Sequence, residues 1–142
     1  MSETAPRRFP AAELEDFIAR ALTSVGLPAQ DASDCGRLMV AADLAGFHTH
    51  GIFRLTQYMK RIRAGGINVT PTVTTVAESP GTALVDGDNA MGHLVVEYAT
   101  KLAIVKARDN GCAWVSARRS NHAGAAATYV SMIADAGLIG LY

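Results

Sequence analysis

The hydrophobic pattern of this 142-residue chain changes its period once, near the pair Gly65-Gly66. Before that pair, apolar residues recur at the three- and four-residue spacing of amphipathic helices. After it, short runs rich in Val and Thr alternate with further helical stretches. We therefore predict an α+β fold, with a three-helix segment over residues 1–66 and mixed α/β layers over residues 67–142.

The three predicted helices are bounded by proline and glycine. The first lies between Pro10 and Gly26, the second follows Leu27-Pro28, and the third ends at Gly65-Gly66. Their apolar stripes are expected to pack against one another. The stripes consist of Leu14, Phe17, Ile18, Ala21, Leu22 and Val25, then Cys35, Leu38, Met39 and Ala42, then Ile52, Leu55, Met59 and Ile62.

Four strands and two helices are predicted after Gly66. The predicted strands cover residues 73–76, 82–85, 112–117 and 138–142, and the predicted helices cover residues 90–109 and 124–136. Turns are expected at residues 79–81, 86–89 and 118–122. Strands as apolar as the last one are normally buried between neighbours. We therefore expect the chain to be part of a longer polypeptide or to be completed by a partner.

Charge and cysteine content exclude several classes of protein. Thirteen basic residues offset thirteen acidic ones, which gives no electrostatic reason to expect nucleic acid or an anionic membrane as partner. Residues 1–8 lack the apolar core of a signal peptide, and the later apolar runs are too short to span a bilayer. Cys35 and Cys112 lie far apart, so we predict two buried free thiols in a soluble cytoplasmic protein.

Two histidines and an arginine gather at the break between the second and third predicted helices. Thr49 is predicted to cap the third helix, so that the imidazoles of His48 and His50 project near its N-terminus. Imidazole titrates near neutrality, which suits proton exchange with a substrate oxygen. Arg54 lies one helical turn after His50, and a guanidinium can hold a carboxylate through two hydrogen bonds. The alternatives are a polar cap with solvated side chains, or a zinc site, which lacks a third ligand.

A second polar cluster, residues 118–124, follows a predicted strand and precedes a predicted helix. Ligand sites in α/β proteins commonly form there. Asn121 and His122 supply hydrogen-bonding groups, and Gly124 permits close backbone approach. The alternative is an ordinary strand-to-helix turn with Asn121 as a cap. Because the chain has no GxGxxG fingerprint, a standard Rossmann cofactor site is not supported.

Two other polar positions are given structural interpretations. Asp86-Gly87-Asp88 is interpreted as a turn, because the other ligand positions of a calcium loop are absent. His93, at the start of a predicted helix, is interpreted as a surface or capping residue. We therefore expect no metal site.

Taken together, these motifs resemble the type 2 malate/L-lactate dehydrogenase family, whose relatives include ureidoglycolate dehydrogenase and cyclic imino-acid reductase. The resemblance covers nearly the whole chain from about Ala12. Thr49 stands where the family usually has a serine; it keeps the hydroxyl group and adds a methyl group that narrows the pocket. The matching segments are residues 42–55, Tyr58, residues 65–67, 86–92, 111–115, 119–124 and 137–140.

The resemblance implies an NAD(P)-dependent oxidoreductase that moves hydride between nicotinamide and a small 2-hydroxy or 2-oxo acid. The substrates expected from the family are of the malate, lactate, ureidoglycolate or imino-acid type. His50 is implied to exchange a proton with the substrate, His122 to share the catalytic role, and Arg54 to hold the substrate carboxylate. Further substrate contacts are expected from His48, Thr49 and Asn121.

The resemblance also implies what this chain lacks. The family fold is not a Rossmann fold, its members are homodimers with sites near the subunit interface, and they continue well beyond the position matching Tyr142. We therefore expect the cofactor, NAD or NADP, to be held mainly outside this chain, with Gly124 as the candidate contact inside it. The alternative is a truncated, inactive chain that serves only as an oligomerisation or binding module. A DNA-binding module is disfavoured because no basic recognition helix is present.

Overall fold

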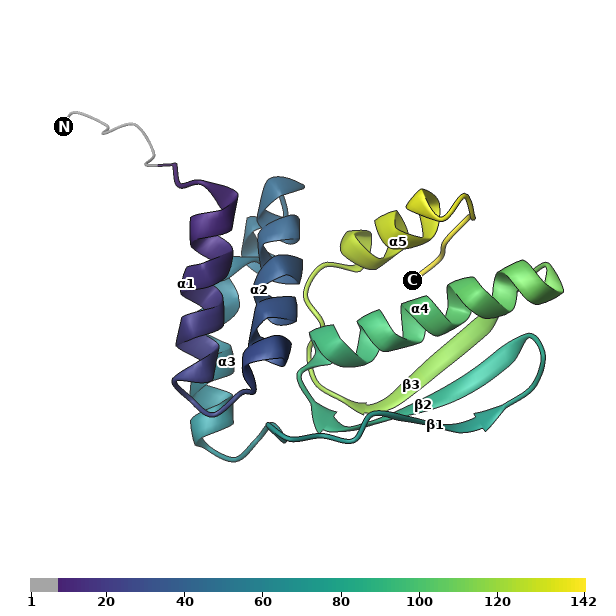
Figure 1. The fold of residues 1–142 in the computed structure, drawn as a ribbon, viewed down its shortest axis with the longest axis horizontal. Helices are drawn as coiled ribbons and strands as arrows, with labels where there is room; N and C mark the ends of the chain where they lie inside the picture. The colour runs from purple at the N-terminus through teal and green to yellow at the C-terminus, as the bar shows by residue number, and fades with distance from the viewer. Residues whose placement is uncertain (1–7) are drawn as a thin grey trace.

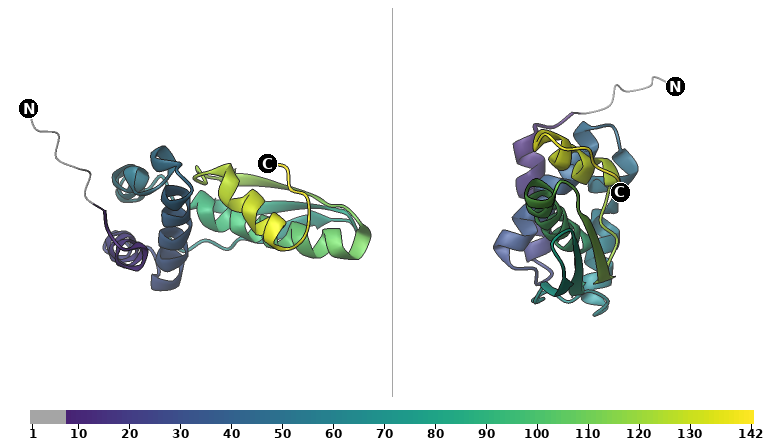
Figure 2. Two further views of the ribbon diagram at one scale, coloured as in Figure 1. Left: turned by 90° about the horizontal axis from the view of Figure 1, so that it is seen from above. Right: turned by 90° about the vertical axis from the view of Figure 1, so that its right-hand side faces the viewer.

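The computed structural model describes residues 8–142; the stretch 1–7, where no signal peptide was predicted, lies outside the described residues. Five α-helices and one three-stranded sheet are present in the described part. The three helices of the N-terminal segment lie at one end of the molecule, and the sheet extends away from them (Figures 1 and 2). This mixture of a helical front and an α/β continuation agrees with the predicted fold class. No described helix is long and apolar enough to cross a membrane.

The helical segment forms as its apolar stripes predict. Helix α1 covers Ala11–Thr23 and α2 covers Ala29–Leu44, each beginning directly after a proline. Proline suits that position because its fixed φ is helix-compatible and its missing N–H would have no partner. Helix α3 covers Leu55–Arg63. Their shared core holds the fully buried Ile18, Leu22 and Met39.

The third helix begins later than predicted. Two 3₁₀ turns, His48–His50 and Ile52–Arg54, precede it, and Thr49 does not cap it. Asp43 instead supports the second 3₁₀ turn, because its carboxylate accepts the Ile52 N–H at 2.8 Å. A Cβ on Gly51 would overlap that carboxylate, so glycine is required between the two 3₁₀ turns.

The sheet has the order β1-β2-β3, with β1 at Thr74–Glu78, β2 at Thr82–Ala90 and β3 at Trp114–Ser120. Strands β1 and β2 are antiparallel and joined by the predicted turn at residues 79–81. Strand β3 runs parallel to β2, and α4, Gly92–Asn110, connects the two. Helix α4 ends one residue after the predicted end at 109, where Gly111 adopts a φ of 83°.

The predicted turn at residues 86–89 is wrong, because these residues belong to β2. Asp88 and Asn89 have left-handed φ values of 46° and 57°, and the register with β3 shifts between Asp86 and Ala90. A bulge of this kind interrupts the ladder without ending the strand. The predicted polar turn at 118–122 likewise begins too early, since Arg118 lies in β3 and donates to the Asp86 carboxylate at 2.9 Å.

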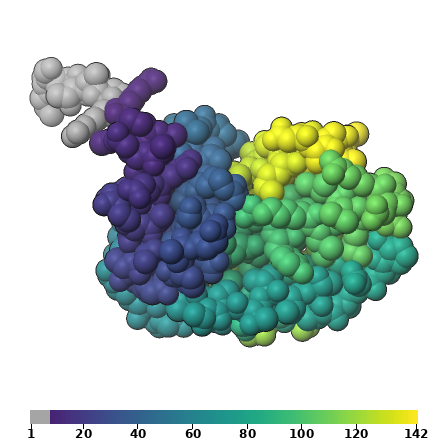
Figure 3. Space-filling model, viewed as in Figure 1, coloured from purple at the N-terminus to yellow at the C-terminus, as the bar shows by residue number. Residues whose placement is uncertain are grey.

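Helix α5 covers Ala126–Asp135 and packs on α4 and α2. The predicted strand at residues 138–142 is wrong, because this stretch makes no ladder with the described strands. It turns back along α5, where the Tyr142 ring stacks on Tyr129 at 5.8 Å (Figure 1). Between these residues, α4 and β3 lies a half-open groove of about 1230 Å³. The atoms of α5 and of the chain end lie over α4 in Figure 3.

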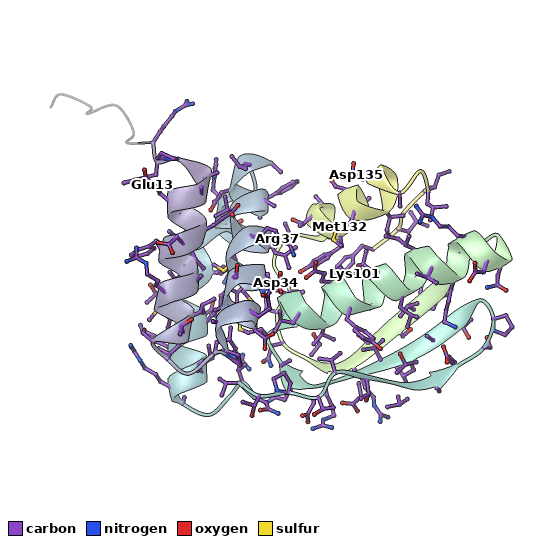
Figure 4. All side chains as sticks on the ribbon, viewed as in Figure 1. Glu13, Asp34, Arg37, Lys101, Met132 and Asp135 are labelled. Carbon is purple, nitrogen blue, oxygen red and sulfur yellow. The ribbon has the colours of Figure 1, made fainter. Side chains whose placement is uncertain are left out.

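A buried carboxylate joins the helical and α/β segments. The Glu97 carboxylate on α4 forms ion pairs with Arg37 of α2 at 2.8 Å and with Lys101 at 2.9 Å (both basic residues are labelled in Figure 4). The prediction of two buried free thiols is confirmed for Cys35 and wrong for Cys112. Cys35 is fully buried, and burial raises the pKa of its thiol, whereas Cys112 is exposed because it precedes the edge strand β3.

Candidate active site

The two predicted histidine clusters meet where the helical segment contacts the carboxyl end of β3. The imidazoles of His50 and His122 stack, with ring centroids 5.6 Å apart and an angle of 22° between their planes. His50 comes from the first 3₁₀ turn and His122 from the link between β3 and α5. Residues 72 positions apart thus form one pair.

Each histidine is oriented by a hydroxyl group. Thr49 Oγ1 lies 2.9 Å from His50 Nδ1, so the Thr49 hydroxyl contacts the imidazole directly. The Tyr58 hydroxyl lies 2.8 Å from His122 Nδ1, and the Gly124 N–H donates to the same nitrogen at 3.3 Å. A backbone N–H can only donate, so Nδ1 of His122 is an acceptor. The proton of the neutral ring therefore lies on Nε2.

The surroundings of His122 favour its neutral form. Desolvation by its neighbours lowers the pKa of His122, and the charges of Arg54 and His50 lower it further. The hydrogen bonds that Nδ1 accepts act in the same direction, because a protonated Nδ1 cannot accept them. His122 nevertheless keeps an exposed edge through which a small molecule can reach it.

Tyr58 is a site residue that the pattern of histidines alone did not reveal. It lies on α3, one turn after Arg54, and is buried. Burial raises the pKa of Tyr58 to about 12, although the charge of Arg54 opposes this. Tyr58 is therefore protonated near neutral pH and able to donate to His122. Its position four residues after Arg54, on the same helical face, was the available sequence signal.

Arg54 lies beside the histidine pair, as predicted. Its Nε donates to the Thr49 carbonyl at 2.9 Å, and Nη1 donates to Gln57 Oε1 at 2.8 Å. These two bonds hold the guanidinium in place and leave Nη2 outside both. A positioned guanidinium next to an acid/base pair is suited to a substrate carboxylate.

Two predicted substrate contacts, His48 and Asn121, have polar partners within the protein. The His48 side chain is 78% exposed, and its Nδ1 lies 3.5 Å from Asp43 rather than in the histidine pair. The Asn121 amide donates to the Asn89 and Ala90 carbonyls at 2.9 Å, while its oxygen accepts from Arg61 at 2.8 Å. Asn121 thus joins the ends of β2 and β3 to α3.

The interpretation of His93 as a surface or capping residue is wrong. Its side chain is only 1% exposed, and burial lowers its pKa to about 3. A Cβ on Gly124, whose φ is 78°, would lie 2.8 Å from His93 Nε2. The absence of a side chain at Gly124 is therefore explained by packing on His93. Across residues 8–142, no three His, Cys, Asp or Glu side chains are grouped as metal ligands.

The sequence profile of malate/L-lactate dehydrogenases matches residues 9–142. With a matching fold, this defines the class of the protein: the chain belongs to the malate/L-lactate dehydrogenase family. It is 43% identical over 134 residues to malate dehydrogenase of Pyrococcus horikoshii, covering 94% of this chain and 37% of that protein. The solved structure of malate dehydrogenase from P. horikoshii OT3 superposes with a TM-score of 0.88, over 92% of this chain and 38% of that one.

Two further relatives carry different names. L-sulfolactate dehydrogenase of Methanocaldococcus jannaschii is 40% identical over 88% of this chain and 36% of its own length. Ureidoglycolate dehydrogenase (NAD(+)) of Escherichia coli O157:H7 is 35% identical over 90% of this chain and 37% of its own length. The chain thus spans little more than a third of the length of the relatives it matches.

Proposed function

We propose that the protein is an oxidoreductase that transfers hydride between NAD or NADP and a small 2-hydroxy or 2-oxo acid. The observation that carries the proposal is the stack of His50 and His122 beside the fixed guanidinium of Arg54. Interconversion of a hydroxy acid and an oxo acid requires a proton carrier at the substrate oxygen and a cation at the carboxylate. The relatives named for malate, sulfolactate and ureidoglycolate support this class of substrate.

Each site residue is given a distinct role. Nε2–H of His122 donates a hydrogen bond to the substrate oxygen, and His50 exchanges the proton with that oxygen. Arg54 binds the carboxylate, and Thr49 orients His50 through the 2.9 Å contact. Asn121 acts as a positioning residue, because both ends of its amide are engaged within the protein. His48 takes part only at the exposed rim, next to Asp43.

The nicotinamide cofactor supplies or accepts the hydride when it is bound. A Cβ on Gly124, the candidate cofactor contact, would lie 2.8 Å from His93 Nε2, so this glycine packs on the protein interior. We therefore derive no step through the cofactor and assign its binding to parts of the site outside residues 8–142. The antiparallel pairing of β1 with β2 supports the prediction that the fold differs from a Rossmann fold.

The proposed activity is tested by following reduced nicotinamide during incubation with candidate acids. Malate, lactate, sulfolactate and ureidoglycolate are each assayed with NAD and with NADP. Turnover of at least one hydroxy acid, abolished in a His50→Ala/His122→Ala double variant, is the expected result. If the folded protein, assayed together with the cofactor-binding part that is proposed to lie outside residues 8–142, oxidises none of the acids and reduces none of the corresponding oxo acids, the proposed function is wrong.

One observation favours the alternative of an oligomerisation or binding module. The groove along β3, α4 and α5 is flanked by exposed apolar side chains, with Trp114 70%, Ile139 98% and Leu141 87% exposed. Contiguous apolar surface of this kind marks a site of association. The alternative predicts self-association, as in a homodimer, without cofactor binding. Light scattering measures the association, and fluorescence titration with NADH and NADPH, in the presence of the proposed cofactor-binding part, separates this module from the enzyme.

A further inference from the structure

His93 is a buried polar side chain that the proposed reaction does not use. Both of its ring nitrogens are buried and lack a hydrogen-bond partner within the described residues. Leaving such a group unpaired costs free energy, so its presence requires an explanation. Its position gives an explanation, because His93 packs against Tyr58 and Gly124, the two groups that hydrogen-bond to His122 Nδ1.

The first of these groups is Tyr58. The His93 and Tyr58 rings meet edge to face, with centroids 5.3 Å apart and an angle of 89°. This is a favourable aromatic geometry, and it fixes the direction in which the Tyr58 hydroxyl points. That hydroxyl lies 2.8 Å from His122 Nδ1.

The second group is the backbone of Gly124. His93 Nε2 is so close to Gly124 that a Cβ there would lie at 2.8 Å, closer than real Cβ contacts occur. The neighbouring Gly92 is equally close-packed, since a Cβ on it would overlap the Asn121 carbonyl oxygen. The first turn of α4 therefore packs closely against residues 121–124 and determines how near they can approach it. This packing also fixes the position of the Gly124 N–H that donates to His122.

We propose that His93 is a positioning residue for His122. Its buried ring packs against both the Tyr58 hydroxyl-bearing ring and the Gly124 backbone, the two donors that fix the tautomer of His122. This inference rests on the proposed function only for its catalytic meaning; the effect on His122 is a property of the protein itself. The titratable or charged groups that face His122 are His50, Arg54, Tyr58 and His93. Among them, His93 acts without a hydrogen bond, through packing.

The test is the titration of His122 by NMR in the full protein with ¹⁵N-labelled histidine, the signals being assigned with His122→Asn. In the wild type, we expect the proton on Nε2 and a pKa below 6.5. In His93→Leu and His93→Ala, we expect the Tyr58 hydroxyl and the Gly124 N–H to move away from His122 Nδ1. Because those bonds favour the neutral form, the pKa of His122 should rise by about 0.5 to 1 unit and the tautomer preference should weaken.

Val95→Ala is the matched control, because Val95 is fully buried on the same helix but packs in a different cluster. It should lower stability without moving the His122 signals. His93→Leu keeps a buried apolar side chain but loses the planar ring that meets Tyr58 edge to face. It also removes two unpaired nitrogens, so it should fold even if His93→Ala does not. An unchanged His122 pKa and tautomer in the folded Leu variant would overturn the inference. Because this readout needs no turnover, its result is independent of whether the dehydrogenase assay succeeds.

Discussion

The helical segment, residues 11–63, and the α/β segment, residues 74–135, differ in how their buried apolar side chains are grouped. In the first, one continuous core holds the fully buried Ile18, Leu22 and Met39. In the second, two smaller clusters lie on either side of α4, and the groove beside β3 leaves Trp114 exposed. The candidate site draws His50 and Arg54 from the well-packed segment and His122 from the open one. Its geometry therefore depends on both.

The largest expected effect comes from removing one histidine from each side of this boundary. In the active protein, His50→Ala should lower kcat by about 10²–10⁴-fold, because general acid/base catalysis is lost, while KM for the acid changes little. His122→Ala should lower kcat less, since it removes a hydrogen-bond donor. Steady-state kinetics of both variants give the comparison. A greater loss in His122→Ala would show that His122, from the open segment, is the principal proton carrier.

The contrast in packing can be measured directly. Leu22→Ala should lower the free energy of unfolding by about 2–5 kcal/mol, because it leaves a cavity in a closed core. Trp114→Ser removes a larger side chain but should change stability by no more than about 0.5 kcal/mol, because that side chain is 70% exposed. Urea denaturation of both variants checks this. Comparable losses would mean that Trp114 is covered in solution and that the groove is closed.

The pH dependence of stability should carry the signature of His93. Unfolded His93 binds a proton below its ordinary pKa of 6.5, whereas the buried ring does not do so until about pH 3. Stability should therefore be full above pH 6.5 and fall by about 1.4 kcal/mol per pH unit from this group as the pH drops. His93→Leu removes that slope, so the two proteins should differ by about 2 kcal/mol more at pH 5 than at pH 6.5. Parallel stability curves would contradict the burial of a neutral His93.

Asp86 provides the internal reference for that experiment. The N–H of Asp88, and then Arg118 and Arg119, lower the pKa of Asp86 below its ordinary value of 3.8. Its contribution is present above pH 3.8 and is lost only as the pH falls through the lower folded value. Loss of stability between pH 6.5 and 5 is therefore not caused by Asp86.

Arg54→Lys changes the site from the side of the helical segment. Lysine keeps the charge but loses the planar pair of donors and cannot reproduce the bonds to Thr49 and Gln57. KM for the acid should rise about tenfold, with a smaller fall in kcat, because the carboxylate contact is shared by ground and transition states. Gln57→Leu is the matched control for the loss of one support of the guanidinium. A fall in kcat without a change in KM would show that Arg54 acts in the chemical step and not in substrate binding.

Local patterns predicted most of the fold, because proline, glycine and apolar spacing act over a few residues. The starts of α1 and α2 and the end of α4 at Gly111 followed from such signals. The errors occurred where a distant partner decides the structure. The bulge at Asp88 is stabilised by Arg119 from β3, which donates to its carboxylate at 2.8 Å. Asp43, far along α2, determines where the 3₁₀ turn before α3 begins.

The same reason separates the predicted from the missed site residues. His50, Arg54 and His122 stand in local motifs whose chemistry is visible in the sequence, and the structure places them together. Tyr58 and His93 gain their environments only when α3, α4 and the link after β3 are assembled. A histidine in the first turn of a helix is usually solvated, whereas His93 is buried against Tyr58 and Gly124.

The smallest expected effect concerns the contact between the two segments. Glu97 on α4 is the buried member of the ion pairs, with 8% of its side chain exposed against 46% for Arg37 and 65% for Lys101. Glu97→Gln removes the charge but keeps the shape, and both basic groups can then be solvated by water. The cost should therefore be about 1 kcal/mol and not the larger value expected when a charge is left buried and unpaired.

Arg20→Ala is the matched control, because its ion pair with Asp16 is exposed and lies within α1 alone. That variant should change stability by less than about 0.5 kcal/mol. Urea denaturation measures both variants, and hydrogen exchange in α2 and α4 locates the loss for Glu97→Gln. Because Glu97 links the closed core to the open segment, faster exchange should appear in both helices. If exchange increases in α4 alone, the helical segment is stable without this contact, and the two segments are less coupled than the shared histidine site requires.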